Sequence, residues 1–83
     1  MENEKTSENQ PYQKFVAGGV SATIWSNKAE KEGKEIEYKT ISIERSYKDK
    51  EDNWRKTSSM RLSDLPKVEL VSRKAFEFLT LRD

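Results

Sequence analysis

The side chains available for chemistry in this chain are carboxylates, hydroxyls, amines and guanidinium groups, because its 83 residues include neither histidine nor cysteine. Without imidazole or thiolate there is no Ser-His-Asp triad, no cysteine nucleophile and almost no usual zinc site. The acidic residues lie among lysines, and the Gly18-Gly19 pair lacks the spacing of a phosphate-binding loop. We therefore expect a binding protein and not an enzyme, with no metal and no cofactor.

Residue periodicity predicts antiparallel strands in the first two thirds of the chain. Val20, Ala22 and Ile24 alternate with Ser21, Thr23 and Trp25, which is the period of two of a half-buried strand. The Gly18-Gly19 pair indicates a turn or bend, so this region is either one bent strand or two strands. The expected strands cover residues 14–27, 35–47 and 54–62, separated by a charged loop at 27–34 and a polar turn at 48–53.

The last part of the chain predicts one helix. Ser63 or Asp64 is a suitable N-cap, and Pro66 falls in the first turn, where its missing N–H costs nothing. Strands followed by a single helix indicate the α+β class with an antiparallel sheet. The helix should bury one apolar stripe, formed by Val68, Val71, Ala75, Phe78 and Leu79.

Length and composition suggest one small domain. Residues 1–12 are nearly all polar and are expected to be a disordered tail, which leaves residues 13–83 as the domain. A folding unit of about 70 residues has a marginal core, so a homodimer would supply missing buried area. The lack of cysteine and of any apolar run long enough for a membrane suggests a cytoplasmic protein.

The polar side of the expected sheet is the candidate site. If the aliphatic residues of the first strand point inward, Trp25 points outward with Tyr38 of the next strand. If Trp54, Met60 and Leu62 point inward, the arginines of the last strand, Arg55 and Arg61, share that outer side. Aromatic rings stack on unpaired bases, while cations and hydroxyls contact phosphates. This combination suits single-stranded nucleic acid.

Other interpretations of the same pattern remain open. Any antiparallel sheet with one hydrated face carries Ser, Thr, Lys and Arg there. The chain could instead be a protein–protein interaction module that uses a sheet face, a strand edge or Trp25 as an anchor. It could also form an OB-like barrel, whose strands bind nucleic acid with aromatic side chains.

Three segments carry a resemblance to a known family. They are Phe15-Val16-Ala17-Gly18 with Val20-Ser21, then Ile41-Ser42-Ile43-Glu44-Arg45-Ser46-Tyr47, and finally Lys56 to Leu62 before the helix opened by Ser63-Asp64. Over residues 15–79 the chain resembles the transcriptional-coactivator family of positive cofactor four, single-stranded-DNA binders related to the Whirly proteins. It departs from that family in having Ser58-Ser59 where a glycine is usual, and in a longer, more acidic segment at 27–34.

The resemblance implies a curved ββββα domain that forms a homodimer through its C-terminal helix. It further implies largely sequence-independent binding of single-stranded DNA, with RNA as the alternative strand, in replication, repair or transcription. Carried over by position, the phosphate-binding residues are Lys14, Lys39, Arg45, Arg55, Lys56 and Arg61. The stacking residues are Trp25, Tyr38 and Trp54.

Overall fold

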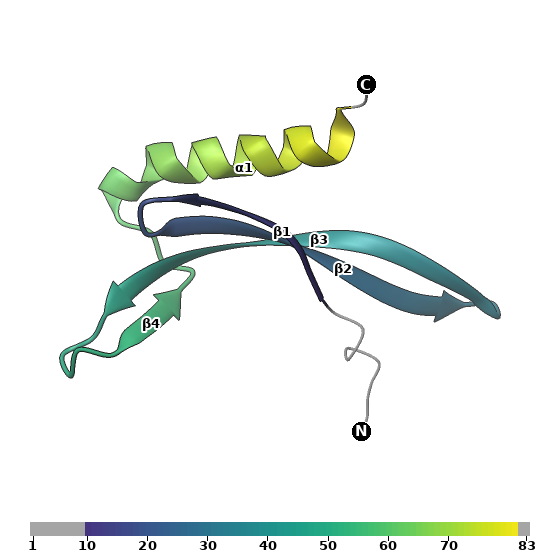
Figure 1. The fold of residues 1–83 in the computed structure, drawn as a ribbon, viewed down its shortest axis with the longest axis horizontal. Helices are drawn as coiled ribbons and strands as arrows, with labels where there is room; N and C mark the ends of the chain where they lie inside the picture. The colour runs from purple at the N-terminus through teal and green to yellow at the C-terminus, as the bar shows by residue number, and fades with distance from the viewer. Residues whose placement is uncertain (1–9, 82–83) are drawn as a thin grey trace.

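The computed structural model describes residues 10–81, which form one antiparallel sheet covered on one face by one helix (Figure 1). The strands follow one another in the order β1-β2-β3-β4, and the sheet is not closed. The predicted α+β class and ββββα order are therefore confirmed, and the OB-like barrel is wrong. The elements are β1 (Gln10–Ala17), β2 (Val20–Lys31), β3 (Lys34–Lys48), β4 (Trp54–Thr57), a short 3-10 helix η2 (Leu62–Asp64) and α1 (Leu65–Thr80).

The core lies between β2 and α1. Val20, Ala22 and Ile24 of β2 are completely buried, and they pack with Val71 and Ala75 of α1. Burial of one such aliphatic side chain contributes about 1.5–3 kcal/mol. This packing confirms the alternation expected for the first long strand, and it fixes which face of the sheet the helix covers.

The predicted apolar stripe of α1 is correct in part. Val71 and Ala75 are buried, and Val68 and Leu79 are partly buried against the core. Phe78 is 45% exposed and lies edge-on against Tyr12 and Phe15 of β1, with ring centroids 6.0 and 5.9 Å away. It is a border residue because the helix lies mainly over β1 and β2.

The connection between β2 and β3 is shorter than the sequence predicts. Instead of a loop at 27–34, the strands pair out to Lys31 and Lys34. The two residues between them, Glu32 and Gly33, have φ values of 53° and 78°. Positive φ at both central residues defines a type I′ turn, whose twist matches that of the strands it joins.

The last strand ends earlier than predicted. Instead of covering 54–62, β4 stops at Thr57, whose hydroxyl accepts a hydrogen bond from the backbone N–H of Ser59 at 3.0 Å. This local turn directs the chain away from the sheet. Met60 then packs against the core from outside the strand.

The N-terminal boundary also differs from the prediction. β1 begins at Gln10, so residues 10–12 of the expected tail belong to the sheet, whereas residues 1–9 lie outside the described residues. A β-bulge between Pro11 and Gln13 interrupts the pairing of β1 with β2. It allows Tyr12 to contact Phe78 of the helix.

The molecule is flat and extended, with principal extents of 47 × 39 × 16 Å. Its radius of gyration is 15.5 Å, whereas a compact domain of this length has about 12 Å. Two arms cause the difference: the β2–β3 hairpin at one end and the β3–β4 hairpin at the other, both bending away from α1 (Figure 1). The sheet is therefore concave on the face without the helix. No helix among residues 10–81 is long and apolar enough to cross a membrane.

Ile24→Ala tests the position of the core. We expect the free energy of unfolding to fall by about 2–5 kcal/mol, because Ile24 is completely buried and its truncation leaves a cavity. Urea denaturation followed by circular dichroism measures this change. Ile36→Ala, on the exposed β2–β3 arm, is the matched control with a small expected effect; equal losses in the two variants would contradict this core.

Candidate functional site

The outer face is the sheet face turned away from α1 (Figure 1). Alternation along each strand, with the pairing register, assigns its members. Thr23 of β2 lies between Lys14 of β1 and Ser42 of β3, and each faces away from the buried aliphatic residues. By the same rule the outer face includes Lys14, Val16, Ser21, Thr23, Trp25, Asn27, Lys31, Lys34, Tyr38, Thr40, Ser42, Glu44, Ser46, Lys48, Trp54 and Lys56.

Aromatic side chains lie toward both ends of the outer face. The half-buried Trp25 is held in place by its indole Nε1–H, which donates to the Ser42 hydroxyl at 2.8 Å. Tyr38 is 48% exposed near it, and Trp54 is 69% exposed on β4. The Lys48 ammonium lies 5.5 Å from the centre of the Trp54 ring. Each ring presents a flat apolar surface, which suits stacking.

The middle of the outer face has a floor of small hydroxyl side chains. Ser21 and Thr23 are only 8% and 7% exposed, although no described element covers this face. Their larger neighbours shield them, because Val16 and Glu44 pair with Ser21 while Lys14 and Ser42 pair with Thr23. The two hydroxyl side chains therefore lie low between longer side chains.

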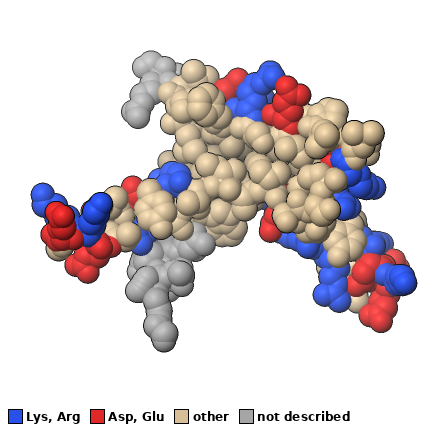
Figure 2. Space-filling view, turned by 180° about the vertical axis from the view of Figure 1, so that it is seen from behind, with Lys and Arg blue, Asp and Glu red and all other residues tan. Residues whose placement is uncertain are grey.

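The charge of the outer face is mainly positive. Glu44 is its acidic residue among the paired strand positions, and its carboxylate lies 3.9 Å from the Lys56 ammonium. Lys48 is 3.8 Å from Asp52 of the neighbouring turn. The basic residues are Lys14, Lys31, Lys34, Lys48 and Lys56. Figure 2 shows basic and acidic side chains together at the ends of both arms, and a body between them that is mostly uncharged apart from a group of charges along its upper edge.

The opposite face, here the helix-side face, carries charges that neutralise one another. Lys28 lies 4.0 Å from Glu35, and Lys39 lies 3.0 Å from Glu37. The Ser26 hydroxyl donates to Glu37 at 2.6 Å, and this bond, with the Lys39 ammonium, lowers the pKa of that carboxyl. Salt bridges of this kind leave little charge to attract a polyanion.

Three of the predicted phosphate-binding residues belong to this helix-side face: Lys39, Arg45 and Arg55. Arg45 pairs with Asp64 at 3.3 Å, and Arg55 pairs with Asp49 at 2.8 Å. The Arg55 hydrogen bond is the main cause that lowers the pKa of Asp49. The structure therefore separates these three cations from Lys14, Trp25, Tyr38, Trp54 and Lys56, which it brings together on the outer face.

Arg61 lies outside the sheet, in an ionic cluster around the buried Asp64 at the start of the helix. Its guanidinium contacts both carboxylate oxygens of Asp64, at 3.1 and 3.2 Å, and its backbone N–H donates to the same group at 2.8 Å. These bonds, with Arg45, hold the pKa of Asp64 below its ordinary value. Asp64 is the N-cap residue as predicted. Its carboxylate accepts hydrogen bonds from Arg61, before the helix, and none from the N–H groups of the helix itself.

The predicted orientation of the last strand is wrong. Trp54 was expected inside and Arg55 outside, but Trp54 pairs with Lys48 and Arg55 with Tyr47, which gives the reverse. The expectation depended on Met60 and Leu62 continuing the alternation of the strand. They follow the turn after Thr57, where that alternation no longer applies.

Three lysines of the outer face are not among the site residues predicted from the sequence: Lys31, Lys34 and Lys48. The first two were placed in a loop and the third in a solvated turn. Lys48 has the same parity as Tyr38, Thr40 and Ser42 along β3, so extending the strand by one residue would have found it.

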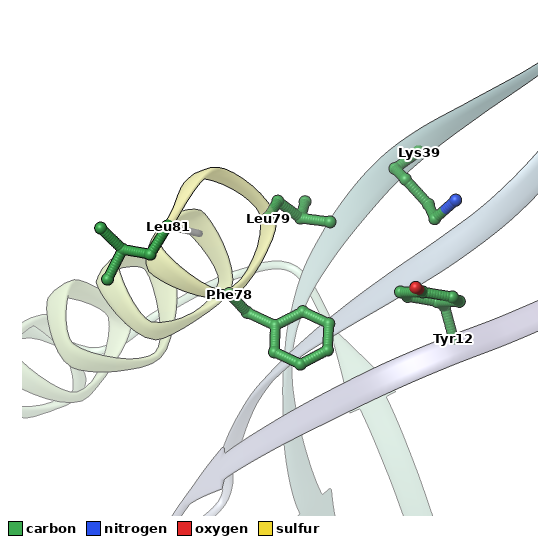
Figure 3. A pocket seen from close by; sticks show the side chains of 5 residues that line it. All are labelled: Tyr12, Lys39, Phe78, Leu79 and Leu81. Carbon is green, nitrogen blue, oxygen red and sulfur yellow. The ribbon is translucent and has the colours of Figure 1, made fainter. Parts of the chain in front are cut away.

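A second surface feature lies at the C-terminal end of α1, a hollow of about 320 Å³ lined by Tyr12, Lys39, Phe78, Leu79 and Leu81 (Figure 3). The Lys39 ammonium lies 4.5 Å from the centre of the Tyr12 ring and 3.0 Å from Glu37. Its charge is thus already balanced, so the hollow is a poor site for an anion. Tyr12 and Leu81 are largely exposed there, so it offers little enclosure.

No protein-family model matches this chain, and no curated protein or solved structure is detectably similar to it. Among residues 10–81 there is also no group of three or more acidic side chains placed to hold a metal ion. Evidence for the role of the outer face therefore comes from its own geometry.

The ionic cluster at Asp64 predicts a pH dependence of stability. Because folding lowers the pKa of Asp64 from its ordinary 3.8, the cluster stabilises the fold above about pH 4 and loses this contribution as the pH falls through the lowered pKa. We expect Asp64→Asn to be less stable than the parent at pH 7, with a difference that shrinks below pH 4. Urea denaturation at several pH values measures it.

Asp52→Asn is the control, since Asp52 lies in an exposed turn. It should follow the parent across the whole pH range. Glu37 and Asp49 also have lowered pKa values, so Asp64→Asn retains part of the loss of stability in acid. A difference between the parent and Asp64→Asn that persists unchanged to pH 2 would contradict the assignment.

Proposed function

We propose that the chain binds single-stranded DNA on the outer face, without sequence specificity and without chemistry. The observation that carries the proposal is the sorting of charge by strand alternation. Among its paired strand positions, the concave outer face has three aromatic rings, five lysines and one acidic residue, Glu44, whereas each of the four basic strand residues of the helix-side face pairs with an acid.

The geometry fits an unpaired strand better than a duplex. Trp25, Tyr38 and Trp54 offer flat rings to bases that are not already stacked in a helix. Each stacked base contributes about 1–3 kcal/mol and requires no particular base identity. Between the rings, the partly exposed hydroxyls of Ser42 and Ser46 on β3 supply donors for phosphate oxygens or sugars.

Phosphate contacts by lysine imply binding that weakens steeply with salt. The formal net charge of the chain is only +1, so attraction depends on the local field of the outer face. For a single strand, the logarithm of affinity falls with the logarithm of salt concentration with a slope of about −0.7 for each phosphate neutralised.

A binding protein is favoured over an enzyme because the chain has no imidazole or thiol. The same sequence features that suggested the cytoplasm support a cytoplasmic site of action, in replication, repair or transcription.

The proposal includes a homodimer formed through the helix. Phe76 is 67% exposed on one flank of α1, and Leu70 is largely exposed on the other. Ile41 of β3 is also exposed on the helix-side face. A second copy that covers these residues would add apolar area to a core made of five fully buried hydrophobic residues, while leaving both outer faces accessible.

A protein partner is the competing function, because Trp54 is strongly exposed and aromatic residues of this kind anchor protein interfaces. A chain that binds only such a protein would show no change in fluorescence when oligonucleotides are added. The salt-dependent titration that follows distinguishes the two functions.

Removal of two outer lysines tests the proposal. With oligo-dT and tryptophan fluorescence at several salt concentrations, Lys48→Gln/Lys56→Gln should bind more weakly than the parent. Its salt slope should be smaller in magnitude by about 1.4, the value for two lost phosphate contacts. Lys28→Gln/Lys74→Gln removes two lysines from the helix side, each in a weak ion pair, and should keep the parent slope. No fluorescence change in the parent at low salt would exclude the function.

Phe76→Asp tests the homodimer. Placing a charge at this exposed apolar position should convert the dimer to a monomer in light scattering, with the circular dichroism spectrum retained, because Phe76 lies outside the core. Lys50→Asp introduces the same aspartate in the exposed turn between β3 and β4, away from these residues, and should remain dimeric. A parent protein that is monomeric at high concentration would contradict this part of the proposal.

A further inference from the structure

The rings of the outer face form two separate stations. Station one is Trp25 with Tyr38, which are diagonal neighbours because Trp25 pairs with Thr40 and Asn27 pairs with Tyr38. Station two is Trp54 with Lys48, which pair directly across β3 and β4 and lie in contact. Both stations are therefore located along β3, at Thr40 and at Lys48.

The separation of the stations follows from the strand between them. Thr40 and Lys48 are eight residues apart on β3, which corresponds to about 26 Å at the rise of a strand. The outer positions between them on β3 are Ser42, Glu44 and Ser46, and none of these is aromatic. Lys56 pairs with Ser46 in this interval and contacts Glu44.

From this spacing, and on the basis of the proposed function, we infer that the ligand is an unpaired strand of about eight or more nucleotides that occupies both stations at once. A stacked strand advances about 3.4 Å per nucleotide, so about eight nucleotides span the interval. Its ends stack on the two tryptophans, and its middle crosses the hydroxyl floor with phosphates near Lys56. A tetranucleotide is too short to reach both.

Joining two weak contacts through one strand makes the second contact intramolecular. Linked contacts of this kind gain roughly 10²–10⁴ in affinity when the linker matches the span. The gain requires both stations, so it disappears when either one is removed. A longer strand also offers more binding registers, which raises affinity whether one station or two are present.

The test compares dT4 and dT12 on the full chain and on Trp54→Ala, by fluorescence polarisation of labelled oligonucleotides. With dT4 the two proteins should differ about twofold, because the parent offers two alternative stations. With dT12 the parent should bind at least tenfold more tightly than Trp54→Ala. The additional binding registers of dT12 raise the affinity of both proteins equally. The ratio of their affinities for dT12 therefore reports the contribution of the second station.

Two further variants complete the design. Tyr47→Ala removes an aromatic residue from β3 on the helix-side face, next to Arg55. It should show the same increase in affinity from dT4 to dT12 as the parent. Trp25→Phe leaves Trp54 as the single indole, and saturating dT12 should quench it.

The outcomes separate this inference from the proposed function. If dT12 binds but Trp54→Ala retains the whole length-dependent gain, or Trp54 is not quenched, the two-station arrangement is wrong and single-strand binding stands. If neither oligonucleotide binds the parent at low salt, the proposed function fails and the inference fails with it.

Discussion

Packing of one helix against one strand determines the rest of this structure. Among residues 10–81, the buried hydrophobic side chains all belong to β2 or α1, where Val20, Ala22 and Ile24 meet Val71 and Ala75. With a core this small, only one sheet face can be covered. The same alternation that buries these aliphatic residues turns the serine, threonine and tryptophan of β2 to the other side. Formation of the core and exposure of the outer face are thus one event.

The sorting of charge between the faces is a second consequence of alternation. On the helix-side face of the sheet, each basic strand residue has an acidic partner, and Asp64 joins Arg45 of β3 to Arg61 before the helix. A buried carboxylate requires such partners, because burial of an unpaired charge is costly. The arginines that resemble phosphate ligands in sequence are therefore occupied in holding the helix against the sheet, and lysines remain for the outer face.

The sequence predicts the class, the element order and the inward set of β2 because these depend on local periodicity. It fails where a decision depends on tertiary contacts. The turn at Glu32-Gly33 has no apolar alternation around it, so a tight two-residue turn and a long hairpin loop look alike in the sequence. The exit of the chain at Thr57 depends on one hydroxyl contact, and this exit reverses the expected orientation of Trp54 and Arg55. A sequence resemblance to a family does not show where β4 ends or which way its side chains face.

An open sheet has two unpaired margins, which invite other copies to add strands and grow into fibres. Both margins of this sheet resist such growth. On β1, Pro11 lacks an N–H and the bulge that follows it breaks the regular spacing of donors and acceptors. On the other side, β4 pairs only with Arg45 to Lys48, so most of the margin is the edge of β3 from Lys34 to Glu44, where five charged residues oppose the addition of a strand. The chain can thus expose a broad, aromatic, concave surface and still resist aggregation.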